Sequence, residues 1–196
     1  MAILSRETIK ERGRILEKAY KANNALYEDS ISAKNSPASV FLSHKHDNKD
    51  ELLGVVDVLK SLGARTYIDW QDNEMPKHTK GETARIIKHK INEMDKFILV
   101  ATEDAIESKW CNWELGYGDA LKYDKNKIAL FPFRDSRNWS GKEYMSIYNM
   151  IEYEDGTDRN INGNTIKEGF YIYDYNKRRE ENIIQLTPLK KWLESN

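Results

Sequence analysis

The segment at residues 108–117 (Ser-Lys-Trp-Cys-Asn-Trp-Glu-Leu-Gly-Tyr) places one carboxylate among aromatic side chains. On a helix, residues spaced at three, four, seven and eleven positions share a face, and here that face comprises Trp110, Trp113, Glu114, Tyr117 and Leu121. A charge on an apolar face is unfavourable unless it is paired, hydrated in a cleft or used in a reaction. Glu114 is therefore the leading candidate for a catalytic residue. A structural alternative stays open, in which the helix is rotated slightly and Glu114 lies at its edge, paired with a lysine or arginine.

Polar residues also follow two short apolar segments that read as strands. Ser43 is the last residue of the segment at 39–43 and is followed by His44. Asp69 is the last residue of the segment at 65–69 and is followed by Trp70. The carboxyl ends of parallel strands form the edge at which open α/β sheets bind ligands. Ser43 and His44 could equally cap the helix that follows, and Trp70 could pack beneath the next loop as ordinary core.

These candidates are positioned by alternating strand and helix patterns. Apolar strand segments are predicted at 39–43, 65–69, 96–101 and 128–131, and amphipathic helices are predicted at 47–62, 81–94 and 108–123. Strands that are apolar throughout and alternate with helices indicate a parallel sheet covered on both faces. The sequence therefore predicts an α/β fold with its strand-end loops along one edge.

Two segments flank this alternating region. Residues 5–29 predict a helix, in which Thr8 and Glu11 have the spacing of a capping box, and the polar segment 30–37 ends in proline and reads as a linker. The tail from residue 134 is irregular and rich in tyrosine. We expect an N-terminal helix and linker at 1–37, a central domain at 38–135, and a C-terminal elaboration at 136–196 that packs on the same domain.

Composition argues against several classes of protein. The chain has 31 Lys and Arg against 32 Asp and Glu, so its formal net charge of −1 gives no electrostatic reason to expect nucleic acid or a membrane as partner. Cys111 is the single cysteine, which excludes an intramolecular disulfide. The start of the chain lacks the apolar core of a signal peptide, and the longest apolar run, about five residues, is far shorter than a membrane span. We expect a cytoplasmic protein.

No metal site is expected from the sequence. His44 and His46, with His78 and His89 elsewhere, lack a ligand spacing supported by cysteine or carboxylate. The segment 158–163 imitates the start of a calcium loop, but the twelfth position is Gly169 instead of glutamate. An Asn-Gly hairpin turn explains that segment better.

Three motifs occur in a fixed order: Phe-Leu-Ser-His at 41–44, Tyr-Ile-Asp-Trp at 67–70 and Ser-Lys-Trp-Cys-Asn-Trp-Glu-Leu at 108–115. Together they resemble a TIR (Toll/interleukin-1 receptor) domain over roughly residues 38–133. The resemblance implies a flavodoxin-like three-layer fold, in which helices flank a central, mostly parallel sheet. With its N-terminal helix and C-terminal elaboration, the whole chain is similar to the TIR proteins of the bacterial Thoeris antiphage system.

The resemblance also implies an activity. Catalytic TIR domains cleave NAD+ between nicotinamide and ribose, and some cyclise the remaining ADP-ribose, so NAD+ would be a substrate and no cofactor would be needed. Glu114 would be catalytic, and the substrate would be bound by Phe41, Ser43, His44, Asp69, Trp70 and Trp110. The cyclic product would activate a separate, ThsA-like effector that degrades NAD+. The enzyme would be latent until infection, and it could assemble as a homo-oligomer through TIR–TIR contacts.

A single carboxylate is compatible with this chemistry. Glycoside hydrolases generally use two carboxyl groups, one of which protonates a poor leaving group. Nicotinamide leaves a cationic pyridinium as a neutral molecule, so the remaining task is to stabilise an oxocarbenium-like ribose electrostatically. The alternative is a non-catalytic TIR adaptor that acts by assembly, because one fold can serve both roles. A phosphorylated receiver domain is disfavoured, since the first strand ends in Ser43 and His44 and not in an acidic cluster.

Overall fold

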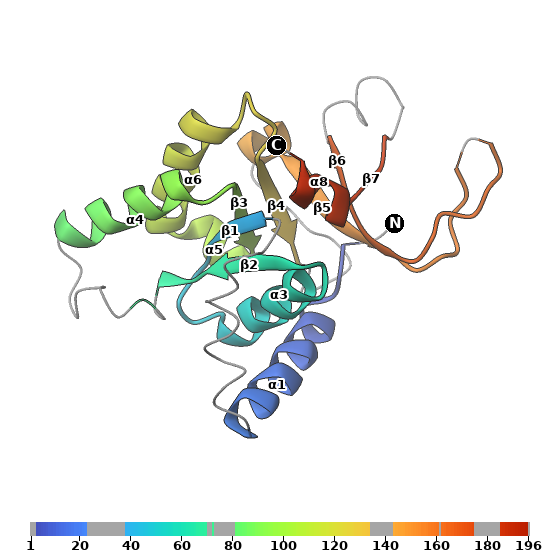
Figure 1. Cartoon of the computed structure of the whole chain (residues 1–196), viewed down its shortest axis with the longest axis horizontal. Helices are drawn as coiled ribbons and strands as arrows, with labels where there is room; N and C mark the ends of the chain where they lie inside the picture. Colours follow the sequence, from blue (N-terminus) through green and yellow to red (C-terminus); the bar gives the residue numbers. More distant parts are fainter. Residues whose placement is uncertain are drawn as a thin grey trace.

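A single sheet with the strand order β2-β1-β3-β4-β5-β6-β7 forms the centre of the protein (Figure 1). The computed structural model describes residues 3–22, 38–69, 72, 81–133, 143–160, 162–174 and 185–195. The strands are β1 (Ala38–Ser43), β2 (Ala64–Tyr67), β3 (Lys96–Ala101), β4 (Ile128–Pro132), β5 (Asn149–Glu154), β6 (Gly169–Asp174) and β7 (Thr187–Pro188).

The first five strands are parallel, and the pairs β5–β6 and β6–β7 are antiparallel. The helices are α1 (Arg6–Ala22), α3 (Lys49–Ser61), α4 (Gly81–Glu93), α5 (Glu103–Glu107), α6 (Lys109–Lys122) and α8 (Leu189–Glu194), with a 3₁₀ turn, η2, at Glu143–Ile147. This architecture confirms the predicted α/β fold with a mostly parallel sheet between helices. The predicted strands and central helices agree with the observed ones to within a few residues at each end.

Each face of the sheet has its own apolar core. One core includes Val40 and Leu42 of β1 and residues of α1, α3 and α8. The other includes Phe41 of β1 and residues of α4, α5 and α6. Alternate side chains of a strand point to opposite faces, so a strand covered on both faces is mostly apolar, and all six residues of β1 are buried.

Helix α1 packs closely against α3, and both helices lie at the bottom of Figure 1. A β-carbon on Gly13 would lie 2.0 Å from the carbonyl oxygen of Asp50, and one on Gly54 would lie 2.1 Å from that of Ile9. The two glycines therefore allow the backbones to touch. At the margin of this contact, Arg12 donates to Asp57 at 2.7 Å.

The N-terminal cap of α1 differs from the predicted capping box. The helix begins at Arg6, and the Ser5 hydroxyl accepts a hydrogen bond from the Thr8 amide at 3.1 Å. Ser5 is therefore the capping residue, and Thr8 lies inside the first turn. The predicted continuation of this helix to residue 29 and the linker at 30–37 lie outside the described residues.

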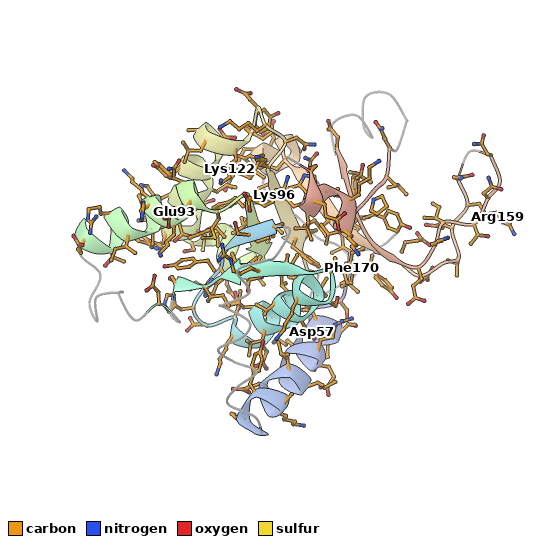
Figure 2. All side chains as sticks on the ribbon, viewed as in Figure 1. Asp57, Glu93, Lys96, Lys122, Arg159 and Phe170 are labelled. Atoms are coloured by element: carbon orange, nitrogen blue, oxygen red, sulfur yellow. The ribbon has the colours of Figure 1, made fainter. Side chains whose placement is uncertain are left out.

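The tail continues the sheet, because β5 pairs with β4, and β6 and β7 follow in order. The backbone turn at 160–164, in which Gly163 has a φ of +77°, confirms the turn predicted at 158–163. This turn belongs to the long β5–β6 hairpin, which carries Arg159 away from the rest of the protein (Figure 2). The division at residues 37 and 135 stays a prediction. Among the described residues, none of the helices has both the length and the apolar character needed to cross a bilayer.

The end of the chain is fixed to the start of β3. The ammonium group of Lys96, which is labelled in Figure 2, donates to the Ser195 carbonyl at 2.8 Å and lies 4.8 Å from the centre of the Trp192 indole. The Trp192 indole donates in turn to the Asn126 carbonyl at 2.8 Å. Burial lowers the pKa of Lys96 to about 8, since a charged ammonium is less well solvated there.

The glycine contact between α1 and α3 gives a stability prediction. Gly54→Ala should lower the free energy of unfolding by about 2 kcal/mol or more, because backbone atoms block the new methyl group. Gly116→Ala on α6 is the matched control, since nothing lies within 4 Å of its added β-carbon. The control should be neutral or stabilising by up to about 1 kcal/mol, because alanine favours helix. Urea unfolding measures both, and equal effects would contradict the close contact.

Candidate active site

Glu114 lies on the buried side of α6. The buried residues of this helix are Cys111, Glu114, Leu115, Gly118 and Lys122. Glu114 is buried, whereas its predicted neighbours on the helix, Trp110, Trp113, Tyr117 and Leu121, are partly buried and pack against the same core. Gly118 lets α6 approach the sheet, because a β-carbon there would lie 2.9 Å from the ring of Phe97.

The structure does not support the alternative in which Glu114 lies at the edge of the helix, because its side chain is buried. Its hydrogen-bond partners include the Ser43 hydroxyl and the Trp110 side chain. Ser43 Oγ donates to Glu114 Oε2 at 2.6 Å, and both residues are buried. Because Ser43 is the last residue of β1, this bond joins α6 to the carboxyl edge of the sheet.

The strand order explains why ligands could reach this edge. From β1 the chain passes through α3 to β2 on one side, whereas β3 lies on the other side of β1 and leads through α5 and α6 to β4. The direction of progress along the sheet therefore reverses between β1 and β3. Open α/β sheets bind ligands at such a reversal, outside the carboxyl ends of the strands. Ser43 and Glu114 lie at this point.

The environment of Glu114 favours its protonated form. Burial raises the pKa of Glu114 to about 8, and the negative charge of Asp69 raises it as well. Hydrogen bonds from the Ser43 hydroxyl and the Trp110 side chain act in the opposite direction, because they stabilise the carboxylate. Glu114 can therefore change its charge near neutral pH, which suits a residue that responds to a cationic substrate.

Aromatic rings line one side of this carboxylate. Trp110 and Trp113 stack with ring centres 4.9 Å apart, and Trp113 and Tyr117 stack at 6.4 Å. The ammonium group of Lys88 on α4 lies 5.6 Å from the Trp113 ring and 5.2 Å from the Tyr117 ring. Trp110 is the member of this stack whose side chain hydrogen-bonds to Glu114. Its contact with substrate stays a prediction.

Phe41 lies beneath the site. Its side chain is 1% exposed and stacks between Tyr67 and Phe97, at ring-centre distances of 5.6 and 5.5 Å. Phe41 therefore supports Ser43 two residues later on the same face of β1. A direct contact between Phe41 and substrate stays a prediction.

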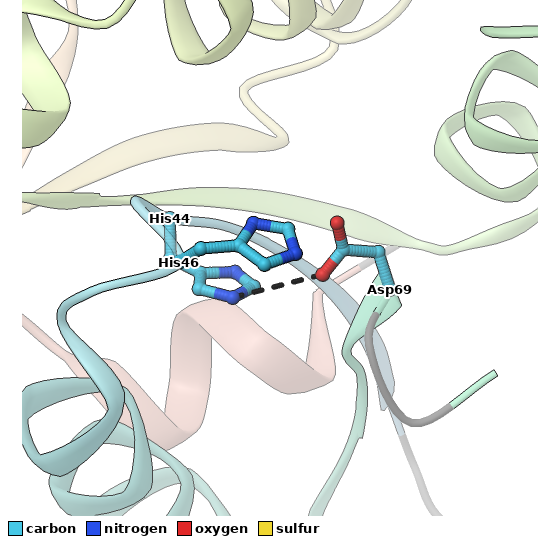
Figure 3. A group of neighbouring side chains, drawn as sticks. All are labelled: His44, His46 and Asp69. Carbon is cyan, nitrogen blue, oxygen red and sulfur yellow. Dashed lines mark ion pairs between the residues drawn. The ribbon is translucent and has the colours of Figure 1, made fainter. Parts of the chain in front are cut away.

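His44 and Asp69 are brought together at the same edge (Figure 3). His44 Nε2 lies 3.6 Å from Asp69 Oδ1, and the His44 ring stacks on His46 with centres 5.8 Å apart. His44 Nδ1 is 3.0 Å from the Leu42 carbonyl oxygen. Burial lowers the pKa of His44, which favours the neutral ring, whereas the charge of Asp69 acts in the opposite direction. Trp70 lies outside the described residues.

The sequence analysis missed two neighbours of this site. His46 was rejected as a metal ligand because no carboxylate lies near it in the sequence. Asp69, at the end of the adjacent strand, supplies that carboxylate. Only the pairing of β1 with β2 could have indicated that the two residues lie close together. Cys111 was considered only for disulfides, yet it lies one helical turn before Glu114 on the buried side of α6. Burial raises the pKa of the Cys111 thiol, so this cysteine is not an activated nucleophile.

A separate cavity of about 710 Å³ lies at the opposite edge of the sheet. Its lining includes Ile128 and Asn149, at the starts of β4 and β5, together with Tyr173, Lys191 and Trp192. Its lining contains none of the residues proposed for the site.

The raised pKa of Glu114 predicts a pH-dependent stability. A carboxyl whose pKa is higher in the folded than in the unfolded protein stabilises the fold while it is protonated, and this contribution is lost as the pH rises through the folded-state pKa. Relative to Glu114→Gln, the wild type should lose up to about 1.4 kcal/mol per pH unit between its ordinary pKa of 4.5 and about 8. Urea unfolding of both proteins from pH 5 to 9 measures the difference. A difference that does not vary with pH would contradict the burial of Glu114.

Comparison with known proteins identifies the family of the chain. The TIR domain family matches residues 40–163. A protein of Bacillus cereus (strain MSX-D12), named "Probable 3' cyclic ADP-D-ribose synthase ThsB'", is 27% identical over 187 residues, which cover 93% of this chain and 84% of that protein. A protein of Cytobacillus dafuensis, named "Putative cyclic ADP-D-ribose synthase TIR2", is 26% identical over 85 residues, which cover 42% of this chain and 22% of that protein. Since the family match spans more than half of the sequence, the chain belongs to the TIR domain family.

Proposed function

We propose that this protein is an enzyme that cleaves NAD+ at the bond between nicotinamide and ribose and closes the remaining ADP-ribose into a cyclic product. The observation that carries the proposal is the buried Glu114 carboxyl, held by Ser43 at the reversal point of the sheet. The two relatives described as cyclic ADP-D-ribose synthases support it, because one of them aligns with nearly the whole chain.

The chemistry follows from the charge at the site. The bond from the ribose anomeric carbon to nicotinamide breaks, and its electron pair goes to the pyridinium nitrogen, which leaves as neutral nicotinamide. The resulting oxocarbenium-like ribose is cationic, and ionised Glu114 stabilises it electrostatically while accepting hydrogen bonds from ribose hydroxyls. A hydroxyl group of the same molecule then attacks the anomeric carbon and releases its proton. The products are nicotinamide, cyclic ADP-ribose and one proton.

The surroundings of Glu114 suit this sequence of events. A carboxyl with a pKa near 8 is mostly protonated in the free protein at neutral pH. The positive charge of the nicotinamide ring would favour its ionisation, so substrate binding and activation of Glu114 would be coupled. Trp110 forms an aromatic wall beside the carboxylate that helps to exclude water, and this protects cyclisation from competing hydrolysis.

The proposal has a biological part as well. The cyclic product acts as a diffusible signal for a separate, ThsA-like effector that degrades NAD+ in antiphage defence. What supports it is the name of the Bacillus cereus relative and the coverage of nearly the whole chain by that match. TIR–TIR assembly into a homo-oligomer and activation by infection remain part of this proposal.

Glu114→Gln tests the enzyme. Incubation of the purified protein with NAD+, and of lysate from phage-infected cells that express it, should release nicotinamide and a cyclic ADP-ribose isomer, resolved by chromatography and mass spectrometry. The variant should lose at least about a hundredfold in kcat/KM, because it cannot carry the negative charge. Lys88→Gln removes an exposed charge beside the aromatic stack and serves as a control for general disturbance. Turnover by Glu114→Gln would move the catalytic site elsewhere, and absence of turnover in both settings would favour an adaptor.

The hydrogen bond from Ser43 to Glu114 predicts that Ser43→Ala shifts the pH profile of kcat/KM. For the wild type, kcat/KM should rise about tenfold per pH unit up to about pH 8 and then level off, because the active form is the carboxylate. Ser43→Ala removes the hydroxyl that stabilises this form, so the midpoint should move to higher pH and kcat/KM at pH 7 should fall about tenfold. Ser43→Thr keeps a hydroxyl and should keep the midpoint near that of the wild type. An unchanged midpoint in Ser43→Ala would show that this bond does not govern the reacting group.

A further inference from the structure

Three potential metal ligands converge where β1 and β2 end (Figure 3). His44 and His46 follow β1, and Asp69 follows β2, which is the parallel neighbour of β1. One ligand atom from each of the three side chains lies within 4.8 Å of the others. The pairing of the two strands therefore brings together residues that are distant in sequence.

The hydrogen bond of His44 fixes which of its ring nitrogens faces Asp69. The carbonyl oxygen of Leu42 can only accept a hydrogen bond, so His44 Nδ1 at 3.0 Å must be the donor. In the neutral ring the proton is then on Nδ1, and Nε2 presents a lone pair. This is the arrangement by which a backbone carbonyl orients a metal-binding histidine.

The lone pair of His44 Nε2 has no hydrogen-bond partner within the described part of the chain, although the side chain is 2% exposed. At 3.6 Å it faces Asp69 Oδ1, which is too far for a hydrogen bond. A neutral imidazole nitrogen and a carboxylate oxygen are both acceptors, so this arrangement is unfavourable unless a cation lies between them. The exposed ring of His46 stacks on His44 at the solvent side.

We propose that His44, His46 and Asp69 bind one divalent transition-metal ion, with Zn²⁺ as the best match. Two imidazoles and one carboxylate form a three-ligand set that leaves at least one coordination position open. Ligand atoms around a tetrahedral zinc ion lie about 3.4 Å apart, close to the distance between His44 and Asp69. His46 reaches the third position by a small side-chain movement, which its exposure allows. Magnesium and calcium are disfavoured because they prefer oxygen ligands.

The open position would take an anionic oxygen ligand. His44 follows Ser43 directly, and Ser43 is bonded to Glu114, so the ion would lie beside the candidate active site. A phosphate oxygen of a dinucleotide has the charge and geometry to occupy that position. This last step rests on the proposed function, whereas binding of the metal does not.

The test begins without NAD+. The untagged, full-length protein is freed of metal with a chelator and titrated with ZnCl₂ by calorimetry, and with CoCl₂ by visible absorption. We expect one equivalent to bind, the cobalt form to show the intense bands of a tetrahedral site, and His46→Ala to weaken binding by at least about tenfold. His89→Ala is the matched control, since His89 is exposed on α4 and pairs with Glu93 at 3.2 Å. It should bind zinc as the wild type does.

The two variants make the outcome decisive. His46 is exposed, so its substitution should leave the thermal unfolding midpoint of the metal-free protein unchanged. Zinc should raise this midpoint only in proteins that retain the site. Weak binding that His46→Ala does not alter would overturn the proposal, as would an octahedral cobalt spectrum.

Addition of NAD+ to the cobalt form should change its absorption bands. If zinc binds as expected but NAD+ changes nothing and is not turned over, the metal site stands and the proposed function fails.

Discussion

The hydrogen bond between Ser43 and Glu114 is the interaction on which the site depends. It is 2.6 Å long, it lies away from solvent, and it joins two elements that are 71 residues apart in sequence. A buried carboxyl without such a partner would be strongly unfavourable. The bond therefore holds Glu114 against the end of β1 and, because it stabilises the carboxylate, opposes the rise in pKa that burial causes. The packing of α6 through Gly118, the burial of Phe41 and the register of β1 all serve to place these two groups in contact.

The two faces of the sheet contribute differently to the protein. On one face, α4, α5 and α6 carry the groups that surround Glu114, and their contacts to the sheet are made by side chains of β1, β3 and β4. On the other face, α1, α3 and α8 form a core that is remote from the carboxylate and is closed by the contact of Gly13 and Gly54. The Lys96 interaction with Trp192 and Ser195 fixes the C-terminal helix at the edge farthest from Ser43. The residues that form the α1–α3 contact are therefore distinct from those that surround Glu114.

Much of this architecture is readable from the sequence, because strands buried on both faces and amphipathic helices have distinct patterns. The strands at 39–43 and 96–101 and the helix at 81–94 were predicted to within one residue at each end. What failed depended on tertiary contacts. The depth at which Glu114 is buried could not be read from helical spacing, because it depends on the close approach of α6 to Phe97 at Gly118. The meeting of His44 with Asp69 could not be read from local spacing, since it depends on how β1 pairs with β2. Ser43, in contrast, was found because strand ends are a topological feature.

The ends of the sheet carry a consequence for how copies of this protein can meet. Within the described part of the chain, the outermost strands are β2, with four residues, and β7, with two. Short edge strands offer few free amide and carbonyl groups to a strand from another molecule, and proteins use this to avoid edge-to-edge aggregation. The proline in β7 removes one further donor from that edge. Self-association by extending the sheet would therefore find little backbone to pair with, and a filament or dimer of this chain would have to form through its helices and loops.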